Sequence, residues 1–505
     1  MSDLPELISK LRDPACYGHA AERARVIETH ISWILLTGDY AYKIKKPLDL
    51  GFLDFSTLDK RLYACQEEVR LNRRLAPEVY LDVVPITGTP EAPRVKGSGE
   101  AFEYAVRMRQ FPAEATLDRL EAEGGLREQH IERIAATLAR FHLENCAVAP
   151  ANGPWGSAEL LWKPVAQNFV QIAPYLESPG DRALLDTLHR WSEREHARLA
   201  PLMAARKQNG FVRECHGDLH LGNLAWVDGE LLVFDCIEFN PELRWIDVQS
   251  EIAFCYMDLL QRGHEEWAWL FLNLWLDETG DYAGLALLRY YAVYRAMVRA
   301  KVAAIRCGQL QGAEREAALS EVRALLDLAL RLTEPMRISL NITHGLSGSG
   351  KSTATRKLMQ KPGAIRIRSD IERKRMAGLD ALARTHSGIG ENLYVADATR
   401  QTYARLAELA GSLLDAGWPV VVDATFLARW QRDLLRAVAK ARNIEFRILD
   451  FPVPVEILKA RITQRAREGR DASEADLAVL QHQINSEEPL DEGELRVSLN
   501  SDSFA

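Results

Sequence analysis

The most constraining feature of the chain is a glycine-rich octapeptide, GLSGSGKS, at residues 345–352. It fits the pattern GxxxxGK[ST], and residues 337–343 before it have the composition of a short buried strand. A helix is expected to open at Ser352. Glycines let the backbone turn so that its N–H groups point at a phosphate beside a helix N-terminus. Strand, loop and helix in this order predict a nucleotide-phosphate site.

Each residue of this loop has an expected part in the nucleotide site. Lys351 is expected to reach the β- and γ-phosphates, and the Ser352 hydroxyl to ligate Mg²⁺. The predicted nucleotide contacts are Gly345, Ser347, Gly348, Ser349, Gly350, Lys351, Ser352 and Thr353. The ligands that this chemistry implies are ATP and Mg²⁺.

A second polar signature, HGDLHLGN, lies well before the first, at residues 216–223. Asp218 and Asn223 have the spacing of the catalytic Asp and Asn in the kinase loop HRDLxxxxN, and a following strand ends in Asp235. We expect Asp218 to accept or orient the proton of an attacking hydroxyl, and Asn223 and Asp235 to hold Mg²⁺. The alternative is a purely structural loop, because His, Asp and Asn are common turn residues.

The surroundings of this signature predict a two-lobed protein-kinase-like fold. Residues 30–46 and 79–109 have strand patterns, with a helical stretch at 61–76 between them. From about 126 to 332 the pattern is helical except for a short strand pair near 223–235. A small strand-rich lobe is therefore followed by a large helical lobe.

The expected ATP-binding lysine lies in the strand YAYKIKKP at residues 40–47. Lys43 and Lys45 share a face because strand side chains alternate, so either residue fits the role. Lys43 is preferred because it lies in the aromatic, buried part of the strand. Its expected ion-pair partner is Glu68, with Glu67 as second choice.

The next strand of the small lobe, at residues 103–108, would lead to the adenine contact, made by backbone near Met108. No GxGxxG loop precedes the strand of the lysines, so the phosphates would be covered by residues 29–32.

The last part of the chain alternates strands and helices, which predicts a P-loop NTPase-type parallel α/β sheet. The expected strands are 337–343, 364–369, 418–423 and 444–450, and the expected helices 351–360, 392–415, 428–441 and 454–467. Asp370 and Asp423 stand where two strands end, at the edge where open α/β sheets bind ligands. The alternative for each is a helix N-cap. Arg461 and Arg465 lie one turn apart on one helix face; an exposed basic helix would look the same.

Composition limits the remaining choices. The seven scattered cysteines lack CxxC spacing and fit reduced thiols. No apolar run is long enough to cross a bilayer, and residues 1–10 do not have the pattern of a signal peptide. We therefore expect a cytoplasmic protein without a membrane partner. The net charge is +3 from residue 337 onward and −11 before it, which argues against a general nucleic-acid binder. Three domains are predicted, at residues 1–112, 113–335 and 336–505.

Two family resemblances follow from these motifs. HGDxxxxN with a strand ending in Asp resembles the aminoglycoside phosphotransferase and choline kinase group. The C-terminal part resembles the small P-loop kinases that include polynucleotide kinase, zeta-toxin-like and gluconate-kinase-like proteins. This second resemblance implies that Asp370 is a general base, Asp423 a Walker B-like acid that acts on Mg²⁺, and Arg461 and Arg465 catalytic lid arginines. The order of the two parts resembles bacterial tandem proteins of the same make-up.

The predicted function is that of a tandem kinase. Each half would transfer the γ-phosphoryl group of Mg·ATP to a hydroxyl of a small molecule. Three alternatives stay open: an ATP-dependent regulatory protein in which one half controls the other, a nucleic-acid end kinase in the C-terminal half, and a toxin or resistance factor. The sequence does not identify either acceptor or the oligomeric state.

Overall fold

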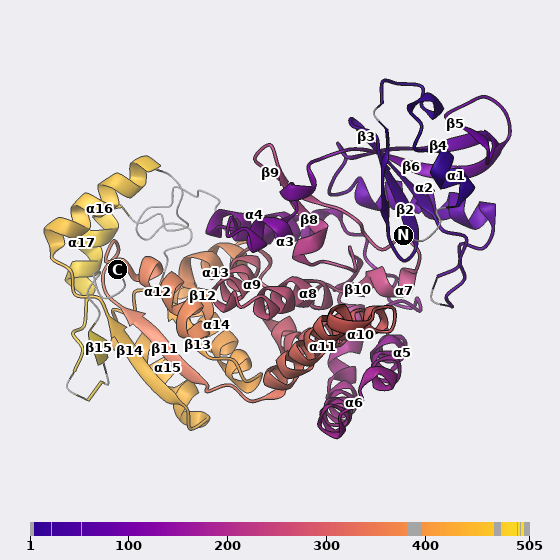
Figure 1. The fold of residues 1–505 in the computed structure, drawn as a ribbon. Coiled ribbons are helices and arrows are strands. Elements are labelled where there is room, and N and C mark those ends of the chain that lie inside the picture. Colours follow the sequence, from indigo (N-terminus) through magenta and orange to yellow (C-terminus); the bar gives the residue numbers. More distant parts are fainter. Residues whose placement is uncertain are drawn as a thin grey trace. The chain divides into compact units, whose positions relative to one another are not determined.

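The structure, a computed structural model, describes residues 5–21, 23–51, 53–380, 396–468, 476–491, 493–494 and 496–498. The chain divides into two compact units. Figure 1 shows the helices and strands that the following paragraphs name. The first unit consists of residues 1–130, 140–170 and 194–258, and the second of residues 131–139, 171–193 and 259–505. The predicted division at residues 112 and 335 does not follow the limits of these units and stays a prediction.

The first unit contains a six-stranded antiparallel sheet with the order β1-β2-β3-β6-β4-β5. Its strands are β1 Arg25–Glu28, β2 Ser32–Leu36, β3 Tyr40–Lys45, β4 Tyr80–Thr89, β5 Ala92–Val95 and β6 Ala101–Arg109. Helix α2, Leu58–Asn72, begins at Thr57, whose hydroxyl accepts the Lys60 N–H as an N-cap. Residues 29–32, the expected phosphate cover, form the tight turn between β1 and β2, where the Thr29 N–H donates to the Ser32 carbonyl.

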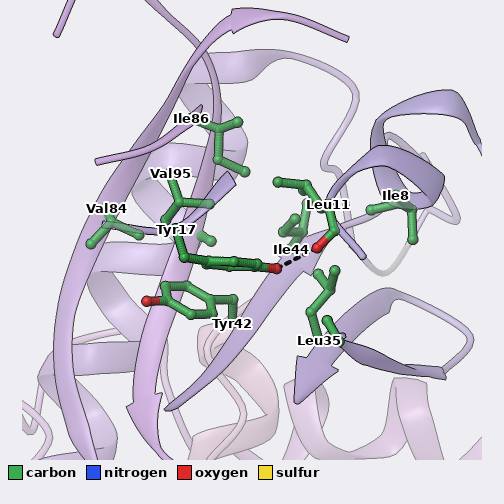
Figure 2. Packing of buried hydrophobic residues seen from close by; sticks show 11 residues of the cluster. Ile8, Leu11, Tyr17, Leu35, Tyr42, Ile44, Val84, Ile86 and Val95 are labelled. Carbon is green, nitrogen blue, oxygen red and sulfur yellow. Dashed lines mark hydrogen bonds between the residues drawn. The ribbon is translucent and has the colours of Figure 1, made fainter. Parts of the chain in front are cut away.

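Strand β3 has two different faces because its side chains alternate. Tyr42 and Ile44 point into a hydrophobic cluster that includes Tyr17 and Leu11 from the N-terminal segment (Figure 2). The Tyr17 hydroxyl donates to the Leu11 carbonyl at 2.6 Å within this segment, and both side chains pack against the sheet in the cluster. One face of the sheet is thus covered by apolar side chains. The side chain of Lys43 lies on the other face of β3, toward α2.

The rest of the first unit is mainly helical, with two short strand pairs. Strand β7 Val212–Glu214 pairs with β10 Trp245–Asp247, and β8 Leu224–Val227 pairs with β9 Glu230–Val233. Asp228 and Gly229 both have positive φ, which makes the β8–β9 connection a primed two-residue turn. Other helices that lie in or enter this unit are α1 Glu6–Lys10, α3 Leu117–Ala122, α4 Glu128–Arg140, α5 Ala158–Ile172, α6 Pro179–Gln208, α7 Pro241–Arg244 and α8 Val248–Gln261.

The second unit contains a parallel five-stranded sheet with the order β12-β13-β11-β14-β15. Its strands are β11 Ser339–His344, β12 Ile365–Arg368, β13 Val420–Asp423, β14 Glu445–Asp450 and β15 Arg496–Ser498. Its helices are α9 Glu265–Thr279, α10 Leu285–Cys307, α11 Gly312–Thr333, α12 Lys351–Leu358, α13 Ser369–Met376, α14 Ala396–Asp415, α15 Arg429–Ala441, α16 Val455–Glu468 and α17 Leu477–Ser486. The four predicted strands are present, and α17 and β15 are additions.

Helix α9 covers the edge strand β12. The Asn273 amide donates to the Ala364 carbonyl at 3.0 Å and accepts the Arg366 N–H at 2.7 Å, so a side chain pairs with the exposed backbone of the strand. Arg366 also forms a buried ion pair with Asp277 at 2.7 Å. The sequence did not predict that helices before residue 335 complete the P-loop sheet.

Within the described residues, no helix combines the length and the apolar character needed to cross a membrane.

Two candidate active sites

The first site is built around the two lysines of β3. Lys43 Nζ lies 2.8 Å from Glu68 Oε1 and 2.5 Å from Asp235 Oδ1. Lys45 Nζ lies 2.5 Å from Glu68 Oε2 and also pairs with Glu238. Glu68 therefore bridges both lysines, and Lys43 is the one that also reaches the predicted metal ligand. This contact favours Lys43 as the nucleotide lysine, a role that stays a prediction.

The buried charges of this cluster shift one another's pKa values. Burial opposes charge on Lys43, but the nearby Asp235 and Glu68 carboxylates outweigh it and hold the Lys43 pKa well above its ordinary value. Burial would raise the pKa of Glu68, yet the two lysines lower it. For Glu238 burial outweighs the attraction of Lys45, so its pKa is raised. Glu238 is thus the carboxyl of this cluster that takes up a proton first.

Glu67, the second choice for the lysine partner, points elsewhere. It pairs with Arg70 at 2.7 Å and with Arg244 at 3.1 Å.

Met108 lies in β6, with its backbone in register with Ala41 and Tyr80 and its side chain in the core cluster below α2. Its part as an adenine contact stays a prediction.

The loop at residues 216–223 brings Asp218 and Asn223 together. Asn223 Nδ2 donates to Asp218 Oδ2 at 3.0 Å and to the Asp218 carbonyl at 2.8 Å. His216 Nε2 lies 2.8 Å from the Phe234 carbonyl, which ties the loop to the residue before Asp235. Burial and the negative charge of Asp218 both act to raise the pKa of Asp235. The positive charge of Lys43 outweighs them, so the pKa of Asp235 is lowered.

Two buried acids in α8 hold this loop in shape and were missed in the sequence. Glu251 accepts the N–H groups of His216 at 2.6 Å and Gly217 at 2.9 Å, and Asp258 accepts the Leu221 N–H at 2.9 Å. Two acids seven residues apart in the otherwise apolar stretch EIAFCYMD were the available signal, because such residues share a helix face.

Asp235 has a left-handed backbone conformation, which is unusual for a residue other than glycine. Its φ is +63°, and its N–H donates to the Tyr80 hydroxyl at 3.1 Å. The carboxylate of Asp235 and the amide oxygen of Asn223 are ligand types that Mg²⁺ prefers, so this donor set fits a magnesium ion.

The second site is the phosphate loop at the end of β11. Gly348 and Gly350 have φ of +84° and +92°, which a side chain would make costly. Lys351 Nζ donates to the Gly345 and Leu346 carbonyls, each at 2.7 Å. The Ser347 N–H donates to Gln483 Oε1 of α17 at 2.9 Å. Donors that would face phosphate are therefore engaged by the protein itself.

The two acids and one of the two arginines predicted for this site line one cavity of about 540 Å³. Asp423 ends β13 and accepts the Thr355 hydroxyl at 3.2 Å, while Arg461 donates to the Gly348 carbonyl at 3.4 Å. The predicted residues that line the cavity are Ser347, Gly348, Ser349, Gly350, Lys351, Ser352, Thr353, Asp370, Asp423 and Arg461. Arg465 belongs to α16, but its side chain lies outside the described residues.

Asp370 is the second residue of α13 and does not cap it, since Arg368 occupies the N-cap position. Its carboxylate lies 3.4 Å from Arg373 Nη1. A carboxylate and the hydroxyl of Ser352 beside a phosphate loop can hold Mg²⁺ or accept a proton. The roles given to these residues stay predictions.

Replacing Gln483 with alanine is expected to strengthen nucleotide binding about three- to tenfold, because the side chain then no longer competes with phosphate for the Ser347 N–H. The affinity for a non-hydrolysable ATP analogue measures this, with the exposed Gln481→Ala on the same helix as the matched control. Weaker binding by the Gln483 variant would show that this side chain contributes to the nucleotide site.

Two family models match the chain. Residues 59–288 match the phosphotransferase enzyme family, and residues 340–490 match an AAA domain model. Relatives from Mycobacterium tuberculosis and Mycobacterium bovis, described as uncharacterized proteins, are 29% identical over 474 residues, which are 92% of this chain and 91% of each relative.

Solved structures that the comparison matched include a choline/ethanolamine kinase family protein from Mesorhizobium loti, with 9% identity and a TM-score of 0.38 over 65% of this chain and 99% of that chain. A gluconokinase from Sinorhizobium meliloti has 22% identity and a TM-score of 0.24 over 33% of this chain and 84% of that chain.

The family matches confirm the predicted fold class and the predicted enzyme class. The N-terminal region is kinase-like and matches the phosphotransferase enzyme family model, and the C-terminal region is a P-loop domain with a parallel sheet. The chain is a kinase-type phosphotransferase.

Proposed function

We propose that this two-region phosphotransferase transfers the γ-phosphoryl group of Mg·ATP to a hydroxyl group of a small molecule in each of its halves. One observation carries the proposal: each site brings a lysine, a candidate base and candidate Mg²⁺ ligands together. A purely regulatory nucleotide site has no need for a base beside the acceptor.

In the N-terminal half, Asp218 would take the proton of the acceptor hydroxyl as its oxygen attacks the γ-phosphorus. Lys43, aligned by Glu68, would contact the phosphates, and Asn223 with Asp235 would hold Mg²⁺. The bond from the γ-phosphorus to the β-γ bridging oxygen breaks, and ADP leaves. When bound, Mg²⁺ neutralises the negative charge that develops on the phosphate oxygens.

In the C-terminal half, Asp370 would be the base and the loop at residues 345–353 would cradle the phosphates. Lys351 must leave its present carbonyl partners to reach them. Arg461 would stabilise the transferring group, since it already contacts the loop through Gly348. Ser352 and Asp423 would hold Mg²⁺.

A small acceptor fits the size of the C-terminal cavity, about 540 Å³, which also has to receive the phosphates of ATP. The weak net charge of this half, +3, argues against a nucleic-acid end as the acceptor. A cytoplasmic location fits the need for ATP and the seven free cysteines.

The test follows label from γ-labelled ATP into a pool of small metabolites. We expect labelled metabolites with the wild type, loss of one product set in Lys351→Ala, and loss of the other in Asp218→Asn. The exposed Lys440→Ala on α15 is the matched lysine control and should behave as wild type. Release of label only as inorganic phosphate would contradict transfer and favour the regulatory alternative.

A further inference from the structure

The backbone of the segment that follows β9 is held from two directions. The Phe234 N–H donates to the Asn223 carbonyl and the Ile237 N–H donates to the His216 carbonyl, each at 3.0 Å. Both carbonyls belong to the loop at residues 216–223. This loop therefore fixes the two ends of the segment that carries the predicted magnesium ligand.

The two N–H groups between these ends bond to side chains from another part of the same unit. The Asp235 N–H donates to the Tyr80 hydroxyl at 3.1 Å, and the Cys236 N–H donates to Asn72 Oδ1 at 2.9 Å. Tyr80 is the first residue of β4 and Asn72 the last residue of α2. Both residues are buried, with 2% and 1% of their surface exposed. Two buried side chains thus hold the backbone at the predicted metal ligand.

The left-handed conformation of Asp235 depends on such support. A φ of +63° brings Cβ close to the following carbonyl oxygen, so this conformation is costly and persists only where the surrounding contacts determine it. The bonds on two successive N–H groups supply these contacts. Without them the backbone would be free to relax to a commoner conformation, and the carboxylate would change its direction.

The carboxylate of Asp235 stays accessible while its backbone is held. Oδ1 lies 2.5 Å from Lys43 Nζ, and 46% of the Asp235 side chain is exposed. A metal ligand needs both an accessible oxygen and a fixed direction, which the groups behind the ligand commonly supply.

Helix α2 connects the support of the metal ligand with that of the lysine. Asn72 Nδ2 donates to the Glu68 carbonyl at 2.8 Å, which orients the amide whose oxygen accepts the Cys236 N–H. Glu68 and Asn72 lie one turn apart on one face of the helix. Since Glu68 Oε1 also binds Lys43 at 2.8 Å, one helix helps to place both the lysine and the backbone beside Asp235.

Tyr80 allows its packing and its hydrogen bond to be separated. Its ring belongs to a buried cluster that includes Val69, Val106 and Met108. Its hydroxyl supplies the bond to the Asp235 N–H. Phenylalanine at this position keeps the ring in the cluster and removes the hydroxyl.

We propose that Tyr80 and Asn72 are positioning residues of the N-terminal site, which hold the backbone at Asp235 and Cys236 so that the Asp235 carboxylate is presented to Mg²⁺. The inference rests on the proposed kinase function of this half. The two side chains act on the metal only through the conformation of Asp235. Loss of either bond should therefore weaken metal binding.

The first test measures metal binding without turnover. Mn²⁺, whose free hydrated ion is observed by electron paramagnetic resonance, is titrated into the full-length Lys351→Ala protein saturated with the non-hydrolysable analogue AMPPNP. The Mn²⁺ binding that Asp235→Asn removes identifies the N-terminal site. We expect Tyr80→Phe to raise the dissociation constant of this site about three- to tenfold, and Asn72→Ala at least as much, because each leaves a backbone donor without its partner.

Tyr17→Phe is the matched control for the loss of a buried hydroxyl. The Tyr17 hydroxyl also bonds to the backbone, in a cluster on the other face of β3, so this variant should bind Mn²⁺ as the parent does. The unfolding midpoint of every variant is measured alongside, and Tyr80→Phe decides alone if Asn72→Ala does not fold.

Unchanged Mn²⁺ binding in the folded variants of Tyr80 and Asn72 would overturn the inference and leave the proposed function standing. An equal loss of binding in Tyr17→Phe would do the same. If Asp235→Asn removes no Mn²⁺ binding, the proposed magnesium site of this half is wrong, and the inference falls with it.

A second test distinguishes positioning from a general loss of structure. In the label-transfer assay, Tyr80→Phe should raise the Mg²⁺ concentration that gives half of the maximal rate for the N-terminal product. The rate at saturating Mg²⁺ should approach that of the wild type, because metal binding makes up for the weakened support. A rate that stays low at every Mg²⁺ concentration would overturn the inference while supporting the proposed kinase function.

Discussion

Asp218→Asn is expected to lower the rate of phosphoryl transfer by the N-terminal half by about 10²–10⁴-fold, the usual contribution of a general base. Asparagine has nearly the size of aspartate and keeps an oxygen that can accept the hydrogen bond now made by Asn223 Nδ2 at 3.0 Å. The loop should therefore keep its shape, because its backbone is held by Glu251 and Asp258. What is lost is the group that takes the proton.

The measurement is the rate of label transfer to the N-terminal product, together with the Michaelis constant for ATP. We expect kcat to fall while the constant for ATP changes little, since Lys43 and Asp235 are untouched. Asp228→Asn is the matched control: this residue lies in the β8–β9 turn with φ of +51°, a conformation that asparagine accepts. Unchanged transfer in Asp218→Asn would remove this residue from the role of base.

Asp277→Ala is expected to destabilise the second unit by about 3–5 kcal/mol, because it leaves Arg366 as a buried charge without its carboxylate. The two side chains lie 2.7 Å apart and are 7% and 4% exposed. The lowered midpoint of thermal or urea unfolding measures the effect. Glu278→Ala, an exposed acid next to it on α9, should leave the midpoint nearly unchanged.

The double variant Asp277→Leu with Arg366→Met tests which effect lowers the stability of Asp277→Ala. The effect is either the unpaired charge of Arg366 or the altered packing between α9 and β12. Replacing both partners by apolar residues leaves no buried charge, so most of the stability should return. A single variant as stable as the wild type, or a double variant that is no better than the single one, would contradict this account of the interface between α9 and β12.

Local patterns sufficed to predict the fold class, while the roles of the site residues stay predictions. Strand β13 ends at Asp423 as predicted, because an apolar run that meets an acid at a sheet edge is a local signal. The sequence preferred Lys43 over Lys45, although both share a face of β3; in the structure both contact Glu68, Lys43 also contacts Asp235, and Lys45 also contacts Glu238. The contacts with Asp235 and Glu238 join residues far apart in sequence, which no local pattern encodes.

Residues that support the sites were missed for the same reason, although the two acids of α8 left a local signal in the sequence. Glu251 and Asp258 belong to α8, and Gln483 belongs to α17, yet each accepts a backbone N–H from the loop of a candidate site far away in the chain. The N-cap alternative for Asp370 shows that helix starts are hard to predict even from neighbouring residues. Helix α13 begins two residues earlier than that alternative required, so Arg368 is the N-cap. Helix ends depend on tertiary contacts that sequence periodicity does not contain.

The covering of β12 by α9 changes what should be regarded as the C-terminal module. A fragment cut at residue 336, where the motif-bearing region starts, would lose Asn273, which pairs with the strand at Ala364 and Arg366. Its sheet would then present bare backbone to other molecules, a common route to self-association. Expression of this half as a separate protein should therefore start before Glu265, and gene fusions that exchange the two halves have to carry α9 along with the P-loop.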